Sequence, residues 1–137
     1  MSRFIRNLTV VEWSVVAASA FLLGTFAYDE VRGQLAERQA TADARRDIAR
    51  GELAFHVGGR RRPWFDKTAA IFESNWGAEL VCSYGCCQAC ADWRYTSRFN
   101  ELMEKAVSKR TARFSFSDAY FDADDEARNM MDSQLAD

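Results

Sequence analysis

The most pronounced hydrophobic pattern of the chain is an apolar run near its N-terminus. No charged residue occurs between Trp13 and Tyr28, and extending the run back to Leu8 adds only Glu12. As a helix, residues 8–28 would be about 31 Å long, which matches a bilayer core of about 30 Å. Trp13 and Tyr28 lie near the two ends, where aromatic side chains prefer the lipid headgroups. The pattern predicts a single transmembrane helix over 8–28, with both aromatics at the membrane surface.

Two other interpretations of this run stay open. Arg3 and Arg6 followed by a short apolar centre and Thr25-Phe26-Ala27 also suit a cleaved secretory signal. A buried helix of a soluble protein is the third interpretation. Basic residues occur on both sides of the run, in the tail 1–7 and again after residue 31, so the side of the membrane that holds the rest of the chain is undetermined.

Residues 29–50 are rich in Ala, Arg, Gln and Glu and contain no proline. They predict a solvated helical stalk that continues directly from the span. The apolar seam of a coiled coil is interrupted by Arg38 and Arg45, so a stalk is favoured over a zipper. Within the span, Ala20 and Gly24 form a small-xxx-small pair of the kind that packs helices together in membranes.

The remaining residues, 51–137, alternate between strand and helix patterns. Residues 53–57 predict a strand, Pro63 opens a helix that ends at Gly77, and residues 78–82 alternate like a second strand. The order strand, helix, strand predicts a parallel pair. A further helix is expected over about 88–109, with its apolar stripe at Tyr95, Phe99, Leu102 and Ala106.

The end of the chain predicts one more strand and one more helix. Residues 113–117 alternate like a short strand, and Ser115 with Asp118 resembles a capping box for a final helix. The fold class expected is therefore α+β or α/β. It comprises an N-terminal transmembrane helix that continues into a stalk, followed by a small β-α-β unit with two further helices.

Composition narrows the functional class. The chain has 137 residues, a formal net charge of −2 and 48% hydrophobic residues. An eight-fold strand-helix barrel needs about 250 residues, so the chain is too short for an enzyme fold of that class. Residues 51–137 are long enough for one small domain. The slightly acidic chain lacks a nucleic-acid recognition module, which excludes nucleic acid as an expected partner.

Four cysteines lie close together at positions 82, 86, 87 and 90. Cys87 and Cys90 form a C-x-x-C motif between a strand and a helix, where a thiol pKa is lowered. The order of elements over about 52–110 resembles the first half of the thioredoxin fold. That resemblance implies that Cys87 is the nucleophile and Cys90 the resolving cysteine of a thiol-disulfide oxidoreductase. Two departures are that the only proline, Pro63, precedes the motif and that few residues remain for the second half of the fold.

A metal centre is the other chemistry that these cysteines suggest. Four thiolates at Cys82, Cys86, Cys87 and Cys90 suffice for tetrahedral zinc. Structural zinc sites normally take their ligand pairs from separate segments, however, and these cysteines are nearly contiguous. The favoured interpretation is structural: Cys82 packs in the core as a small hydrophobe, or disulfides staple the loop in an oxidising compartment. No cofactor is expected.

Other polar groups give weaker indications. Arg60, Arg61 and Arg62 form a dense basic run that suits a membrane-surface contact, with a solvated loop as the alternative. His56, the single histidine, is expected to be an ordinary strand residue. The acidic group at 122 and 124–126 lacks calcium-loop spacing and predicts a solvated helical face.

The sequence as a whole favours a single-pass membrane protein that acts as an accessory or interaction subunit without catalysis of its own. Its expected partners are the lipid bilayer and other membrane-protein subunits. The aromatic residues of 64–99 are too many for a small sheet to cover, which indicates that part of the domain docks on another protein. A membrane-tethered oxidoreductase and a cysteine-metal module are the alternatives.

Overall fold

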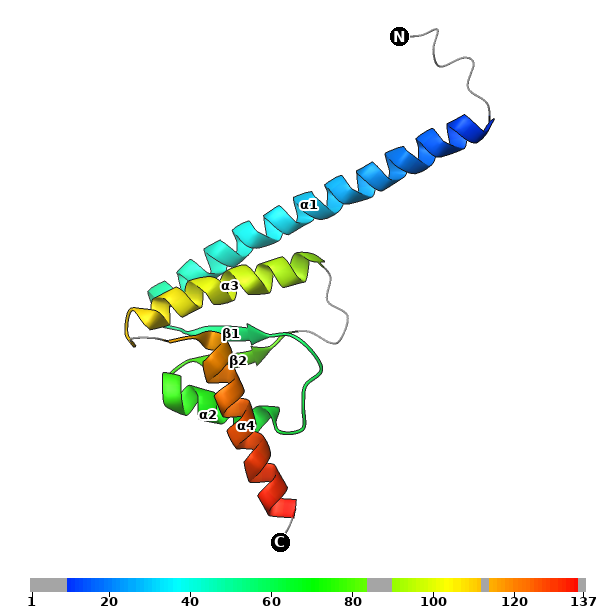
Figure 1. Cartoon of the computed structure of the whole chain (residues 1–137). Coiled ribbons are helices and arrows are strands. Elements are labelled where there is room, and N and C mark those ends of the chain that lie inside the picture. The colour runs from blue at the N-terminus through cyan, green and yellow to red at the C-terminus, as the bar shows by residue number, and fades with distance from the viewer. Residues whose placement is uncertain (1–9, 84–89, 112–113, 136–137) are drawn as a thin grey trace.

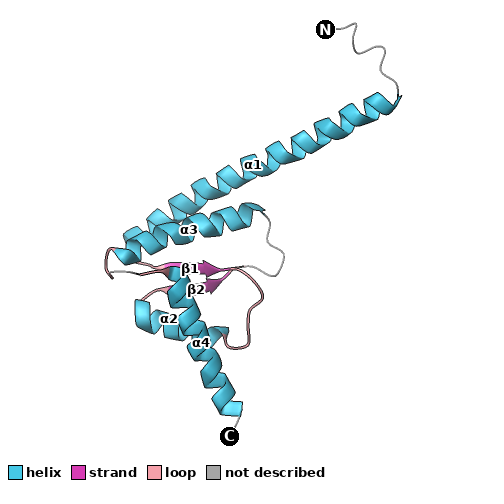
Figure 2. Cartoon of the chain, viewed as in Figure 1, coloured by secondary structure: helices cyan, strands magenta, loops and turns pink. Residues whose placement is uncertain are grey.

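The computed structural model describes residues 10–83, 90–111 and 114–135, and this part of the chain is mostly helical (Figure 2). Its elements in chain order are α1 (Val10–Arg50), β1 (Ala54–Val57), α2 (Phe65–Trp76), β2 (Glu79–Cys82), α3 (Cys90–Ser108) and α4 (Phe116–Leu135). A long apolar N-terminal helix, a β-α-β unit and two further helices are therefore present, as the sequence predicts.

Helix α1 is a single uninterrupted element of 41 residues, about 61 Å long. An 18-residue window within it has a mean hydropathy of 1.7 and is 0% buried, so by length and composition the helix is a candidate membrane span. Figure 1 shows its first half projecting away from the rest of the molecule. The predicted continuation of the apolar run into the helix that follows it is confirmed, because Val10–Arg50 is one helix.

The second half of α1 differs from the solvated stalk that its composition predicts. Gly33, Ala40 and Ala44 are buried, and this half of the helix packs along α3. The buried positions are all small residues, spaced by seven and by four, so they share one face along which the two helices can approach closely. The sequence hides this contact because an alanine stripe carries little hydrophobic signal.

The two strands form a parallel pair in which His56 lies opposite Val81. Between them, α2 starts two residues after Pro63 and ends at Gly77, whose backbone has a φ of 63° and whose N–H donates to the carbonyl of Glu73 at 2.8 Å. Glycine adopts this left-handed conformation without the steric cost of a Cβ atom. The predicted strand-helix-strand unit is thereby confirmed.

The free side of β1 is occupied by a side chain instead of a third strand. The His56 N–H donates to Asn100 Oδ1 at 2.8 Å, and Asn100 Nδ2 donates to the His56 carbonyl at 2.7 Å. Asn100 lies on α3, so the amide group also ties this helix to the sheet. The backbone of a short edge strand is thus hydrogen-bonded on both sides at its centre.

Two details of the C-terminal half depart from the predictions. The fully buried stripe of α3 includes Phe99, Met103 and Val107, while Tyr95, Leu102 and Ala106 pack at its margin. The strand predicted over 113–117 is wrong for the described residues: 114 and 115 are loop, and α4 begins at Phe116. The capping interaction is present, since the Asp118 N–H donates to Ser115 Oγ at 3.5 Å.

The sheet separates two pairs of helices, with α1 and α3 on one face and α2 and α4 on the other (Figure 1). Phe55 projects toward α2 and α4, where it stacks on Phe116 at 4.5 Å between ring centroids and meets Phe72 edge-on at 5.7 Å. His56 projects the opposite way and meets Phe99 edge-on at 4.6 Å. Most of the described aromatic residues that follow α1 pack in these two layers.

Candidate functional site

The carboxyl ends of β1 and β2 border a hollow of about 560 Å³. The loop after β1 supplies three arginines, Arg60, Arg61 and Arg62, while β2 supplies Cys82 and α4 supplies Tyr120. Ligands of parallel α/β folds characteristically bind outside this edge of the sheet. Burial, followed by the nearby charge of Asp124, raises the pKa of Tyr120. The phenol carries an O–H group that can donate a hydrogen bond.

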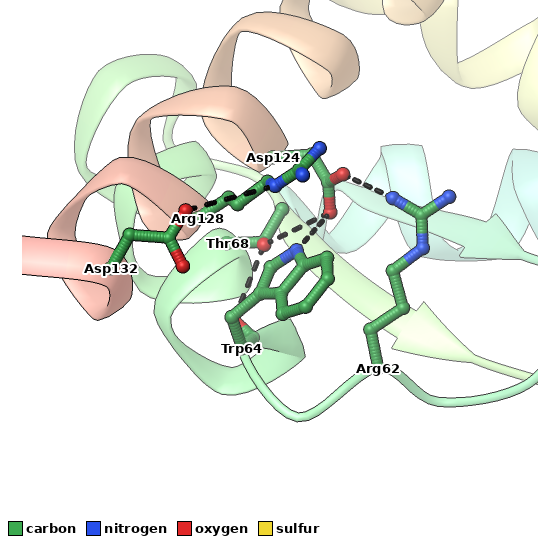
Figure 3. Close-up of polar contacts among 6 residues, drawn as sticks. All are labelled: Arg62, Trp64, Thr68, Asp124, Arg128 and Asp132. Carbon is green, nitrogen blue, oxygen red and sulfur yellow. Dashed lines mark hydrogen bonds and ion pairs between the residues drawn. The ribbon is translucent and has the colours of Figure 1, made fainter. Parts of the chain in front are cut away.

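Asp124 is the most deeply buried charged residue in this region, with 5% of its surface exposed. Figure 3 shows its carboxylate facing groups from α2 and the preceding loop. Trp64 Nε1 donates to Oδ1 at 2.9 Å, and Thr68 Oγ1 donates to the same oxygen at 3.4 Å. Arg62 donates to Oδ2 and forms an ion pair with it. Sequence reasoning assigned Asp124 to a solvated acidic face, and this assignment is wrong.

Two of the three arginines in the basic run are therefore engaged within the protein. Arg62 pairs with Asp124, and Arg61 pairs with Asp66 on the first turn of α2. Within the part of the chain that the structure describes, Arg60 makes no ion pair. A membrane-surface role for this run remains a prediction. Arg60 is the arginine of the three whose guanidinium could contact lipid headgroups without first breaking an ion pair of the described residues.

The cysteines are only partly described. Cys82 is half-buried at the end of β2, and its thiol lies 3.9 Å from the Gly59 carbonyl oxygen, a weak S–H···O contact. Cys90 is the first residue of α3, whereas Cys86 and Cys87 lie outside the described residues. Among the described residues, no group of three His, Cys, Asp or Glu side chains is arranged to hold a metal ion. The redox and metal hypotheses therefore stay predictions.

The junction between α1 and α3 holds most of the charged contacts of the first helix. Arg94 donates through both terminal nitrogens to the two carboxylate oxygens of Glu30, at 3.1 and 2.7 Å. Its side chain lies across Gly33, where an added Cβ would come within 2.6 Å of Arg94 Cδ. The next residue of α3, Tyr95, donates to Asp43 of α1 at 3.1 Å. Hydrogen bonds from Arg94 and then from Gln34 lower the pKa of Glu30.

These contacts attach α3, and with it the small domain, close to the end of the apolar run, because Glu30 is two residues beyond Tyr28. Tyr28 itself is 62% exposed, with the Arg32 guanidinium 5.7 Å from its ring centroid. In the apolar half, an added Cβ at Gly24 would meet nothing within 4 Å. The predicted packing face at Ala20 and Gly24 is thus open to a neighbouring helix.

Comparison of the chain with protein-family models, with curated proteins and with solved structures finds no match.

Several of the residues that organise the site were missed by sequence reasoning. Asp124 and Arg94 look like ordinary charges of amphipathic helices, and their partners lie between 56 and 64 positions away in the chain. A signal was available for Gly33, because glycine inside a helix costs about 1 kcal/mol relative to alanine and usually marks a close approach.

His56 gives the domain a measurable pH dependence. Its ring contacts Ser83 Oγ and the edge of Phe99, and burial lowers its pKa, partly offset by Asp47 and Glu79. Because the folded-state pKa lies below the unfolded value of about 6.5, the unfolded chain binds the proton more readily. Stability should therefore fall as the pH drops below about 6.5.

We expect a His56→Gln variant to lose stability less steeply between pH 7 and pH 5 than the parent chain. Thermal unfolding of the full chain in mild detergent, followed by circular dichroism at several pH values, measures the difference. Carboxylates titrate mainly near pH 4, so they leave this window largely unaffected. Parallel curves for the two proteins would contradict the assignment.

Proposed function

We propose that this protein is a single-pass membrane-anchored accessory subunit, whose small α/β domain binds another membrane-associated protein and catalyses no reaction. The observation that carries the proposal is the division of α1 into an uncovered apolar half and a half that packs on α3. A helix of this kind fixes the domain beside the bilayer instead of suspending it from a flexible tether.

Burial supports the anchoring part of the proposal. Phe21, Leu22 and Leu23 are each 65–72% exposed, so in water a large apolar surface would be in contact with solvent. In a bilayer the same side chains face lipid, and the helical backbone satisfies its own hydrogen bonds. The aromatic residues Trp13 and Tyr28 then bracket the hydrocarbon layer at its two interfaces.

The outer surface of α4 supports the interaction part. Phe121 is 57% exposed and Met130 is 46% exposed, and α4 points away from the rest of the domain (Figure 1). Aromatic residues and methionine are enriched in protein interfaces relative to other surfaces. Because Phe121 and Met130 are nine positions apart, they point to opposite sides of α4. We therefore assign the partner-binding surface to the projecting length of this helix, which a partner would contact from both sides.

Carbonate extraction of membranes tests the anchor. We expect the full chain to remain in the pellet after alkaline washing and ultracentrifugation, with an N-terminus that still contains Trp13. A Leu22→Arg variant should insert less well, because a charge at the centre of a span costs about 3 kcal/mol. A chain released to the supernatant, or one whose mature form begins near Tyr28, would contradict the proposal.

The interaction part has its own test. Solubilised in mild detergent, the chain should migrate in native gels as part of an assembly larger than its own micelle. A Phe121→Ser, Met130→Ser double variant should release it from that assembly while it stays in the membrane fraction. An Asp122→Ser, Asn129→Ser variant, which changes neighbouring exposed polar positions of α4, is the control and should leave the assembly intact.

A further inference from the structure

A groove of about 560 Å³ runs between α1 and α3, below the apolar half of α1. We call it the α1–α3 groove. The side chains that matter for its chemistry are Arg38 and Thr41 from α1 and Trp93, Arg94, Ser97 and Arg98 from α3. This groove is separate from the hollow at the strand ends, since the two have no lining residue in common.

The groove opens close to the expected bilayer surface. Gln34, at its near end, is six residues beyond Tyr28, and Arg38 is ten residues beyond it, about 9 and 15 Å along the helix axis. Arg38 must therefore reach back to the headgroup layer through its long side chain. The headgroup layer extends about 5–7 Å beyond the hydrocarbon core. Both helices run away from the apolar half of α1 (Figure 1), and helical Cα–Cβ bonds tilt toward the N-terminus. The side chains of Trp93 and Arg38 therefore lean toward the lipid.

The charges in the groove leave one guanidinium available. Arg94 is engaged by Glu30 and Glu37, and Arg98 by Glu101 at 2.7 Å. Arg38 is exposed, and in the described ranges of the chain it forms no ion pair. Beside it, Trp93 is 60% exposed, an unusual position for an indole in water and a favourable one among headgroups.

We propose that the α1–α3 groove binds the phosphate of an anionic phospholipid headgroup in the leaflet nearest the domain. Arg38 pairs with the phosphate, the Ser97 hydroxyl lies in the same groove as a hydrogen-bond donor, and the Trp93 indole enters the headgroup layer. The inference rests on the proposed membrane anchor and adds a lipid preference to it. A free phosphate ion shares this chemistry, so the experiment must separate the two sources.

The test uses the full chain in a nonionic detergent, titrated with phosphatidylglycerol and, separately, with phosphatidylcholine. Native mass spectrometry counts the lipids bound. We expect phosphatidylglycerol to bind more tightly than phosphatidylcholine, and Arg38→Gln to weaken it about fivefold, the effect of about 1 kcal/mol per basic residue. Trp93→Ala should also weaken it, and inorganic phosphate should not displace it at equal concentration.

Arg45→Gln is the matched control, because Arg45 is also exposed and lies two helical turns beyond Arg38 on the same face of α1. We expect it to leave lipid binding unchanged. Equal binding of the two lipids, or equal losses in the Arg38 and Arg45 variants, would overturn the site. Displacement by inorganic phosphate would identify a phosphate-ion site in place of a lipid site.

Failure of this inference can be distinguished from failure of the anchor. If only the lipid site is wrong, the parent chain still resists carbonate extraction and merely shows no preference between lipids. If the anchor is wrong, the parent chain leaves the membrane whatever the lipid. Unchanged circular dichroism of the Arg38→Gln chain shows that the substitution does not act by unfolding it.

Discussion

Replacing Asp124 by alanine should lower the free energy of unfolding of the domain by about 2–3 kcal/mol. The substitution leaves the Trp64 indole N–H without its acceptor and removes the partner of Arg62, whereas the Thr68 hydroxyl keeps the Trp64 carbonyl as an acceptor at 3.3 Å. A buried donor left without its acceptor costs about 1–3 kcal/mol. Because the Arg62 side chain is 50% exposed, water compensates its lost ion pair, and this contact adds little.

Thermal unfolding of the full chain in mild detergent measures the loss. For a domain of this size, 2–3 kcal/mol lowers the midpoint by about 10 °C or more. Asp124→Asn keeps an acceptor oxygen and should lose less. Asp125→Ala, at the exposed neighbouring position, should stay within about 0.5 kcal/mol of the parent. A loss as large at Asp125 as at Asp124 would show that α4 charge, and not the buried network, determines stability.

Replacing Phe55 by alanine should have a larger effect, a loss of about 3–5 kcal/mol. Phe55 is 0% exposed, and its ring contacts Phe72 of α2 and, around the start of α4, Phe114 and Phe116. The cavity left behind cannot close without moving both α2 and α4 off the sheet. The loss of the ring–ring contacts adds to the free energy that is lost when the apolar side chain is no longer buried.

Near-ultraviolet circular dichroism and limited proteolysis of the full chain report this change directly. We expect the aromatic signal to collapse at a lower temperature and cleavage to begin between α2 and α4. Phe121→Ala removes the same side chain from an exposed position, 57% accessible, and should leave stability nearly unchanged. Similar behaviour of the two variants would mean that the phenylalanine cluster does not form the core.

The elements that the sequence predicts well are those with a strong local signal. The apolar run from Trp13 to Tyr28, the stop at Gly77 and the alternation around Leu80 each depend on a few adjacent residues. Hydrophobic periodicity and glycine conformations are properties of the local chain, and all three predictions match α1, α2 and β2.

The predictions that were wrong concern residues whose structure depends on contacts with distant parts of the chain. The residues around Phe116, expected to form a strand, form the start of α4. Phe114 and Phe116 both pack against Phe55 and Phe72, on the face of the sheet that α2 and α4 cover. Tertiary packing of this kind overrides a weak two-residue alternation. Burial of Asp124 depends likewise on Trp64, sixty positions earlier, and no local pattern reports such a pairing.

The amide of Asn100 has a consequence for how the protein tolerates crowding with copies of itself. A strand with an open edge has unpaired N–H and C=O groups, and a strand of another chain can pair with them and extend the sheet. Aggregates grow by this kind of pairing. At the outer edge of β1, the donor and the acceptor of His56 are already occupied by one side chain. An incoming strand would have to displace that amide first, so the sheet resists templated growth along this edge.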